Sequence, residues 1–202
     1  MKHPTSRLLH AYWDRVRRDR AAPERSEIEP GAIRNLLADA LILSVDVPES
    51  QAAFRLAGTR VCALFRRELR GSDFAQLWGA PDADPWRLIE TVATDTVGMV
   101  AGLHAETDRG ETVDLELLLL PLRHRGQTQS RILGSLSPHV IPHWLGLRPL
   151  VRLRATSLRV LQPVCPPNLE MDGDVLHGLP APANDSLPRR HGHLLVHPGG
   201  RA

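Results

Sequence analysis

The stretch FRLAGTRVCALFRRELRGSDF, residues 54–74, decides the fold of this chain. Its first residues are typical of the end of a strand, Ala-Gly-Thr at 57–59 predicts the passage into a short helix, and Gly71 is expected to end that helix. The chain contains three phenylalanines in all, and each of them lies in this crossover: Phe54, Phe65 and Phe74. Aromatic side chains carry a large buried area, so this stretch is expected to shape the interior of the domain.

The residues before this stretch predict a helical region followed by two strands. Residues 6–20 are expected to form an amphipathic helix with Ser6 as its N-cap. A second short helix is predicted to open at Pro30. The apolar runs 40–47 and 51–59 predict two strands joined by a tight turn. The apolar stripe of the first helix consists of Leu8, Leu9, Tyr12, Trp13 and Val16.

The residues after this stretch predict one long helix and then a change to strand periodicity. Residues 85–101 carry apolar residues at helical spacing, with Asp84 as the expected N-cap. Residues 102–122 alternate with a period of two around a tight turn and therefore predict an antiparallel hairpin. The segments 131–140 and 150–161 predict further strands.

The order of these elements defines the expected fold class. A helix, two strands, several helices and three antiparallel strands predict an α+β fold: an antiparallel sheet with a helical crossover on one face and an N-terminal flanking helix. On the strand 111–122, Thr112, Asp114 and Glu116 alternate with apolar residues and are expected to face water. We divide the chain into a helical extension (1–37), a domain with one or two extra C-terminal strands (38–161) and a Pro/Gly-rich tail that is expected to be disordered (162–202).

Composition excludes several classes of protein. The 202 residues are 42% hydrophobic, enough for a real core, and the net charge of +2 gives no whole-chain attraction to nucleic acid or an anionic membrane. No apolar run is long enough to span a bilayer, and no signal peptide is recognisable, so a cytoplasmic location is expected. Cys62 and Cys165 lie in unrelated contexts, so no structural disulfide is expected.

Three passages give the chain a resemblance to a known family. They are YWDRVR (12–17), FRLAGTRVCALFRRELRGSDFAQLWG (54–79) and RILGSLSP (131–138). Together with the order of elements, they resemble the PAS sensor fold, and in particular the single-domain PAS proteins found chiefly in alphaproteobacteria. The resemblance spans roughly residues 6–161, and its most specific part is R-L-A-G-T followed by L-F-x-x-E-L-x-G.

The resemblance implies an apolar ligand pocket between the crossover helices and one face of the sheet. For any single phenylalanine, a plain core role is the competing interpretation. The candidate lining residues are Phe54, Leu56, Cys62, Phe65, Phe74, Trp78, Ile89, Val92, Leu117, Leu119 and Ile132.

No built-in cofactor is predicted. Flavin-binding photoreceptors of this family use a cysteine within an Asn-Cys-Arg type motif, which the surroundings of Cys62 do not match. Haem-binding relatives supply a histidine from the long helix, and residues 85–101 contain none. No metal site is predicted either, because the prolines beside His139 and His143 break the helix that would bring the two together.

The predicted function is a stand-alone sensor or adaptor in bacterial signalling, without an attached output domain. It is expected to bind an unknown small molecule, a signalling protein, or both, and to act without catalysis, because no catalytic motif is present. A small-molecule enzyme and an arginine-rich nucleic-acid-binding regulator are the alternatives, the latter through Arg15, Arg17, Arg18 and Arg20. The apolar stripe of the first helix is expected to form a homodimer interface.

Overall fold

The computed structural model describes residues 1–79, 84–161, 189–191 and 194–196. Met1–Leu161 form one compact unit, and Gln162–Ala202 belong to a second one. In the second unit, the short strands β7 (Arg189–His191) and β8 (Leu194–Val196) pair antiparallel. The rest of the tail that was predicted to be disordered lies outside the described residues.

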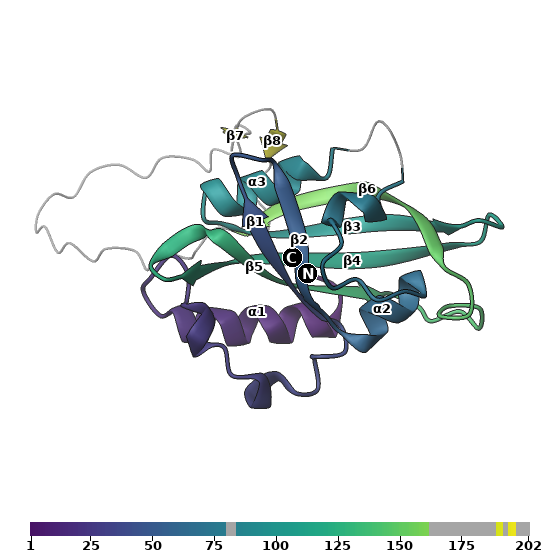
Figure 1. The fold of residues 1–202 in the computed structure, drawn as a ribbon, viewed down its shortest axis with the longest axis horizontal. Helices are drawn as coiled ribbons and strands as arrows, with labels where there is room; N and C mark the ends of the chain where they lie inside the picture. The colour runs from purple at the N-terminus through teal and green to yellow at the C-terminus, as the bar shows by residue number, and fades with distance from the viewer. Residues whose placement is uncertain (80–83, 162–188, 192–193, 197–202) are drawn as a thin grey trace, which may run out of the picture. The chain divides into compact units, whose positions relative to one another are not determined.

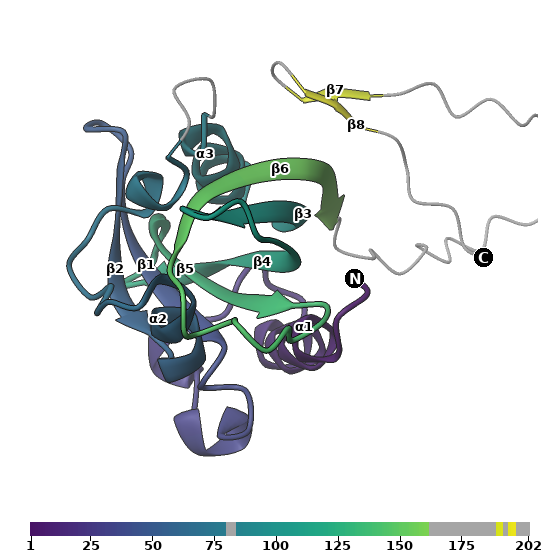
Figure 2. The same cartoon turned by 90° about the vertical axis from the view of Figure 1, so that its right-hand side faces the viewer.

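The first unit is built on a six-stranded antiparallel sheet with the order β2-β1-β5-β4-β3-β6. Figure 2 shows β6 curving along the edge of this sheet beside β3. The predicted α+β fold with crossover helices between the second and third strands is therefore confirmed. The strands are β1 (Ala40–Asp46), β2 (Gln51–Ala57), β3 (Gly98–Thr107), β4 (Thr112–His124), β5 (Gln127–Pro138) and β6 (Leu150–Leu161).

Helices cover both faces of the sheet (Figure 1). The inner face packs against the crossover, and the outer face packs against the N-terminal region, each through its own cluster of buried side chains. The crossover consists of α2 (Thr59–Phe65), the 3₁₀ helix η3 (Phe74–Leu77) and α3 (Trp86–Thr94). The N-terminal region consists of α1 (Pro4–Arg17) and the 3₁₀ helices η1 (Arg25–Glu27) and η2 (Pro30–Ile33). No helix in the described part of the chain has the length and apolar character to cross a membrane.

The predicted helix 85–101 is wrong in its second half. α3 ends at Thr94, Thr96 takes a left-handed backbone conformation with φ 52°, and β3 begins at Gly98. β3 pairs with β4 on one side and with β6 on the other. In the strand conformation, the backbone N–H and C=O groups of this segment therefore find hydrogen-bond partners on both sides. β-Branched residues in this segment also favour a strand over a helix. Asp84 forms an ion pair with Arg87 and does not cap the helix.

The first helix begins earlier than predicted. α1 opens at Pro4, and its N-cap is His3, whose side chain accepts a hydrogen bond from the backbone N–H of Thr5. Ser6, the expected N-cap, lies inside the helix and is buried. The short helix expected from Pro30 is present as the single 3₁₀ turn η2.

The crossover also ends its first helix earlier than expected. α2 stops at Phe65, where Arg66 takes a left-handed conformation. Gly71, with φ 84°, lies in the following turn, where its N–H donates to the carbonyl oxygen of Phe54 at 2.7 Å. Residues that carry a Cβ rarely adopt such a φ, so a glycine at this position lets the chain return to the edge of β2.

Gly58 is needed because two backbones touch at this point. A Cβ at this position would lie 2.2 Å from the carbonyl oxygen of Leu37 and 2.3 Å from that of Ala38. The amide of Gly58 donates to Ala40 at 2.8 Å, and the amide of Arg60 donates to Ala38 at 2.9 Å. The segment before β1 therefore crosses the start of α2 with no room for a side chain.

α1 packs directly on the outer face of its own sheet. Leu9, Tyr12 and Trp13 are buried there. The indole Nε1 of Trp13 donates to the carbonyl oxygen of Pro121 at 2.8 Å, and the hydroxyl of Tyr12 accepts from the amide of Glu29 at 2.8 Å. The N-terminal extension is thus part of the same core as the sheet.

We predict that Gly58→Ala destabilises the domain by about 1–3 kcal/mol or more, because the added methyl group meets backbone that cannot move aside cheaply. Urea unfolding followed by circular dichroism measures this loss. Gly31→Ala is the matched control, since a Cβ there meets nothing within 4 Å. Equal stability of the two variants would contradict the close backbone contact at Gly58.

We predict that Trp13→Ala lowers the free energy of unfolding by about 3–5 kcal/mol, because it leaves a cavity and an unpaired carbonyl on Pro121. Leu8→Ala, at a side chain that is 58% exposed, should change it by less than about 0.5 kcal/mol. Thermal unfolding at two protein concentrations separates this loss of fold from a loss of association. A stable Trp13→Ala monomer would show that this indole packs against something other than its own sheet.

Candidate functional site

The structure brings almost all of the predicted lining residues together on the inner face. Cys62 is half-buried and packs against the same cluster, with its Sγ 3.8 Å from the carbonyl oxygen of Ala57. Burial raises the pKa of the Cys62 thiol, so a reactive thiolate is disfavoured. The other members are buried: Phe54, Phe65, Phe74, Trp78, Ile89, Val92, Leu117, Leu119 and Ile132.

Aromatic rings form the centre of this inner cluster. The ring centroids of Phe54 and Phe74 lie 6.0 Å apart, and those of Phe74 and Trp78 lie 5.9 Å apart in an edge-to-face arrangement. Phe65 belongs to the same cluster at the end of α2. The indole Nε1 of Trp78 is buried and has no hydrogen-bond partner among the described residues. A donor of this kind is costly to bury alone, so an acceptor placed here would be bound favourably.

Leu56 lies on the opposite face from the other predicted lining residues. A bulge shifts the pairing of β1 with β2 between Ile42 and Leu43, so that Leu43 pairs with Phe54 and Ile42 pairs with Leu56. Such a bulge changes the face to which the following side chain points. Leu56 therefore borders the outer face, where it is 39% exposed.

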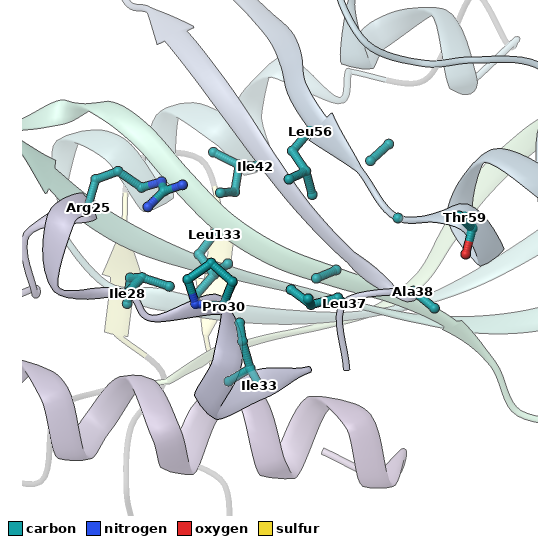
Figure 3. A pocket seen from close by; sticks show the side chains of 13 residues that line it. Arg25, Ile28, Pro30, Ile33, Leu37, Ala38, Ile42, Leu56, Thr59 and Leu133 are labelled. Atoms are coloured by element: carbon teal, nitrogen blue, oxygen red, sulfur yellow. The ribbon is translucent and has the colours of Figure 1, made fainter. Parts of the chain in front are cut away.

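This shift opens a pocket between the outer face and the N-terminal segment (Figure 3). The pocket has a volume of about 310 Å³. Ile42, Leu133 and Leu56 form its sheet side, and η1, η2 and the residues before β1 form the other. Arg25 extends its guanidinium toward Ile42 in Figure 3. The remaining lining residues are Ile28, Pro30, Ile33, Leu37, Ala38, Ala40, Ala57, Gly58 and Thr59.

Sequence reasoning missed this outer-face pocket for two physical reasons. The segment from Pro30 onward was predicted to be a helix, but residues 25–38 fold into two 3₁₀ helices and turns, whose side chains do not follow helical spacing. The bulge that exposes Leu56 depends on strand pairing, which a single strand does not encode. The one usable signal was Pro30-Gly31 between apolar residues, which marks a turn and not a pocket.

A buried carboxylate fixes the N-terminus beside a second pocket. Glu116 was expected to face water, but it is only 4% exposed, because the chain start covers it. Its carboxylate accepts hydrogen bonds from the amides of Lys2, at 2.6 Å, and His3, at 3.0 Å. Burial acts to raise the pKa of Glu116, but these hydrogen bonds outweigh it and hold the pKa below its ordinary value.

The second pocket, of about 250 Å³, is more polar than the first. Its lining includes His3, Asp39 and Arg60. Asp39 is buried and pairs with Arg60 at 2.8 Å. Burial raises the pKa of Asp39, although the guanidinium of Arg60 opposes this change. The ion pair joins the start of β1 to α2, so it reinforces the crossing at Gly58.

The side chains proposed for a homodimer interface are used mainly within the chain. Leu9, Tyr12 and Trp13 are buried against the outer face, and Val16 packs partly against the same cluster. Leu8 remains open to solvent. The dimer stays a prediction, but its surface cannot be the whole stripe, because most of the stripe is covered by the sheet.

Comparison with known proteins gives the family. A PAS domain family model matches residues 1–137, which include the N-terminal extension, the crossover, β1 to β4 and all but the last residue of β5. This chain therefore belongs to the PAS domain family. No curated protein matches the chain.

Solved structures of light-oxygen-voltage domains are also similar to this chain. The light-state structure of the blue-light photoreceptor Aureochrome1 LOV is 18% identical and has a TM-score of 0.41, over 57% of this chain and 91% of that one. A light-oxygen-voltage domain studied with a flavin analogue is 15% identical, with a TM-score of 0.43 over 58% and 87%. An RNA-binding light-oxygen-voltage receptor is 16% identical, with a TM-score of 0.41 over 62% and 36%.

We predict that Glu116 stabilises the fold in a pH-dependent way. Because its folded pKa is depressed, its contribution is complete above the ordinary value of 4.5 and is lost as the pH falls through the lower folded value. The difference in unfolding free energy between the wild type and Glu116→Gln should therefore shrink on acidification. Urea unfolding from neutral to acidic pH measures it. Asp108→Asn, at an exposed carboxylate in the turn between β3 and β4, is the control. A constant difference for Glu116→Gln would contradict the role of this carboxylate in holding the chain start.

Proposed function

We propose that this chain is a sensor or adaptor module of bacterial signalling that binds a small molecule and passes the change to a protein partner. The observation that carries the proposal is the outer-face pocket, whose two walls belong to separate parts of the fold. One wall is the sheet, and the other is the segment that joins α1 to β1. PAS membership supports a sensory role for such a pocket.

The proposed mechanism uses the contact between this segment and α2. Ala38 lines the pocket, and its carbonyl oxygen accepts hydrogen bonds from the amides of Arg60, at 2.9 Å, and Val61, at 3.3 Å. A ligand that prefers one position of the segment would therefore bias α2 on the other face of the sheet. It can shift the two arrangements only by its difference in affinity for them.

We propose binding and not catalysis as the activity of this pocket. Its lining is mainly aliphatic and contributes one charged side chain, Arg25, and one side-chain hydroxyl, Thr59. General acid–base or nucleophilic chemistry needs positioned groups in reach of each other, which this lining does not supply.

A nucleic-acid-binding role for the N-terminal arginines has little support from their contacts. Arg17 pairs with Asp14 at 2.6 Å, and Arg20 pairs with Glu27 at 2.9 Å. Two of the four cations are thus neutralised locally, which lowers the attraction to phosphates.

The proposed partner is a signalling protein or a second copy of the chain in the cytoplasm. Large apolar side chains that remain exposed offer a contact surface, among them Val140, Ile141 and Leu147 in the segment before β6. Leu8 on α1 is another exposed apolar side chain. Exposed apolar side chains that lie together favour protein contacts.

We predict that the purified chain captures a small molecule from an extract of its native cells, and that native mass spectrometry detects the complex. Leu56→Trp should abolish capture, because a larger side chain at the pocket mouth fills the space. Leu158→Trp is the matched control, since Leu158 is 40% exposed and lies outside this pocket.

Two other results would correct the proposal. Capture that survives Leu56→Trp but is lost in Trp78→Phe would move the ligand site to the inner face. Absence of any complex in the wild type would contradict the small-molecule form of the proposal.

A further inference from the structure

Three arginines lie in or next to the lining of the outer-face pocket, and Arg25 and Arg55 act electrostatically on Arg131. Arg25 lines the pocket itself. Arg55 immediately precedes Leu56 at the bulge of β2, and Arg131 lies two residues before Leu133 on β5, with both leucines in the pocket lining. We call these three residues the arginine cluster.

Arg131 faces the same side of the sheet as the pocket. Its guanidinium donates to the hydroxyl of Ser44 at 2.6 Å, and Ser44 lies on β1 two residues after Ile42. It also donates to the carbonyl oxygen of Ser130 at 2.7 Å. A guanidinium carries five N–H groups, so these two hydrogen bonds leave other N–H groups of Arg131 free to donate to a ligand.

The cluster lacks an opposite charge. Within the described residues, none of the three guanidinium groups has a carboxylate at ion-pair distance, while the nearby Glu24 and Glu27 pair with Arg123 and Arg20. Burial lowers the pKa of Arg131, and the charges of Arg55 and Arg25 lower it further. Like charges that approach without a counter-charge repel each other, and an anion placed between them would relieve that repulsion.

We propose that the ligand of this pocket is a small amphipathic anion, with one apolar chain in the pocket and a carboxylate or phosphate head at the arginine cluster. This inference rests on the proposed function and names its ligand class. The aliphatic lining takes the chain, and guanidinium groups recognise planar carboxylates and phosphates through paired hydrogen bonds.

The size of the pocket favours a free molecule over a membrane lipid. A volume of about 310 Å³ lies at the lower end of the range for small-ligand sites, roughly 300–1,000 Å³. One short alkyl chain suits this space better than the two chains of a bilayer lipid. The ligand is therefore expected to be taken from solution.

The test is calorimetric titration of the full chain with decanoate and with 1-decanol, which shares the chain but lacks the charge. Decanoate should bind, and decanol should bind at least about ten-fold more weakly. Arg25→Gln and Arg55→Gln should each weaken decanoate binding about ten-fold, while leaving decanol binding unchanged. Arg154→Gln, an exposed arginine on β6, is the control and should alter neither.

A second measurement separates ligand recognition from a structural role. Without ligand, Arg55→Gln should leave the melting temperature unchanged or raise it, because it removes repulsion. Decanoate should raise the melting temperature of the wild type, and it should raise that of Arg55→Gln by less. A loss of stability in ligand-free Arg55→Gln, with equal decanoate affinity, would overturn the proposal.

The remaining outcomes are also decisive. Equal binding of decanol and decanoate, or no binding of either, would overturn the anionic class. A further outcome is that the chain co-sediments with phosphatidylglycerol vesicles in a way that depends on Arg25, without binding decanoate. That result would overturn the conclusion that the ligand is taken from solution. If the extract still yields a neutral molecule that Leu56→Trp excludes, the sensor proposal stands and only the ligand class fails.

Discussion

The rest of the structure depends on the contact between the backbones of Leu37, Ala38 and Gly58. This crossing joins the N-terminal segment on the outer face to the first crossover helix on the inner face. A side chain at Gly58 would force the two apart, because backbone on each side is held by hydrogen bonds. The contact thus fixes where β1 starts, where α2 starts and how closely the two layers approach.

Both candidate pockets border this crossing. The outer-face pocket includes Ala38 and Gly58, and the more polar pocket includes Asp39 and Arg60. A displacement of the segment before β1 would therefore reach either pocket without passing through the packed aromatic rings of the inner face. This arrangement differs from a ligand held between crossover helices and sheet, where the ligand would have to displace buried side chains such as Phe54 and Phe74.

Local patterns predicted the elements that bury one regular face. α1, the first two strands and the hairpin of β3 with β4 follow from apolar spacing and turn residues. The inner cluster was also predictable, since Phe54, Phe65 and Phe74 lie on elements that must pack together. The helix predicted over 85–101 failed because residues from Gly98 onward can bond to two neighbouring strands, and a single sequence does not show those neighbours.

The sequence by itself determined the order of most elements and most of the core, because these depend on the periodicity of apolar residues and on turn residues. Its resemblance to the PAS family rests on three particular passages of sequence and not on this periodicity. Only the tertiary structure decided the outer-face pocket, the burial of Glu116 and the position of Leu56. Each of these depends on a non-local partner: the segment 25–38 packed against the sheet, the chain start folded over β4, and the bulge between β1 and β2. Long-range contacts of this kind have no periodic trace along the chain.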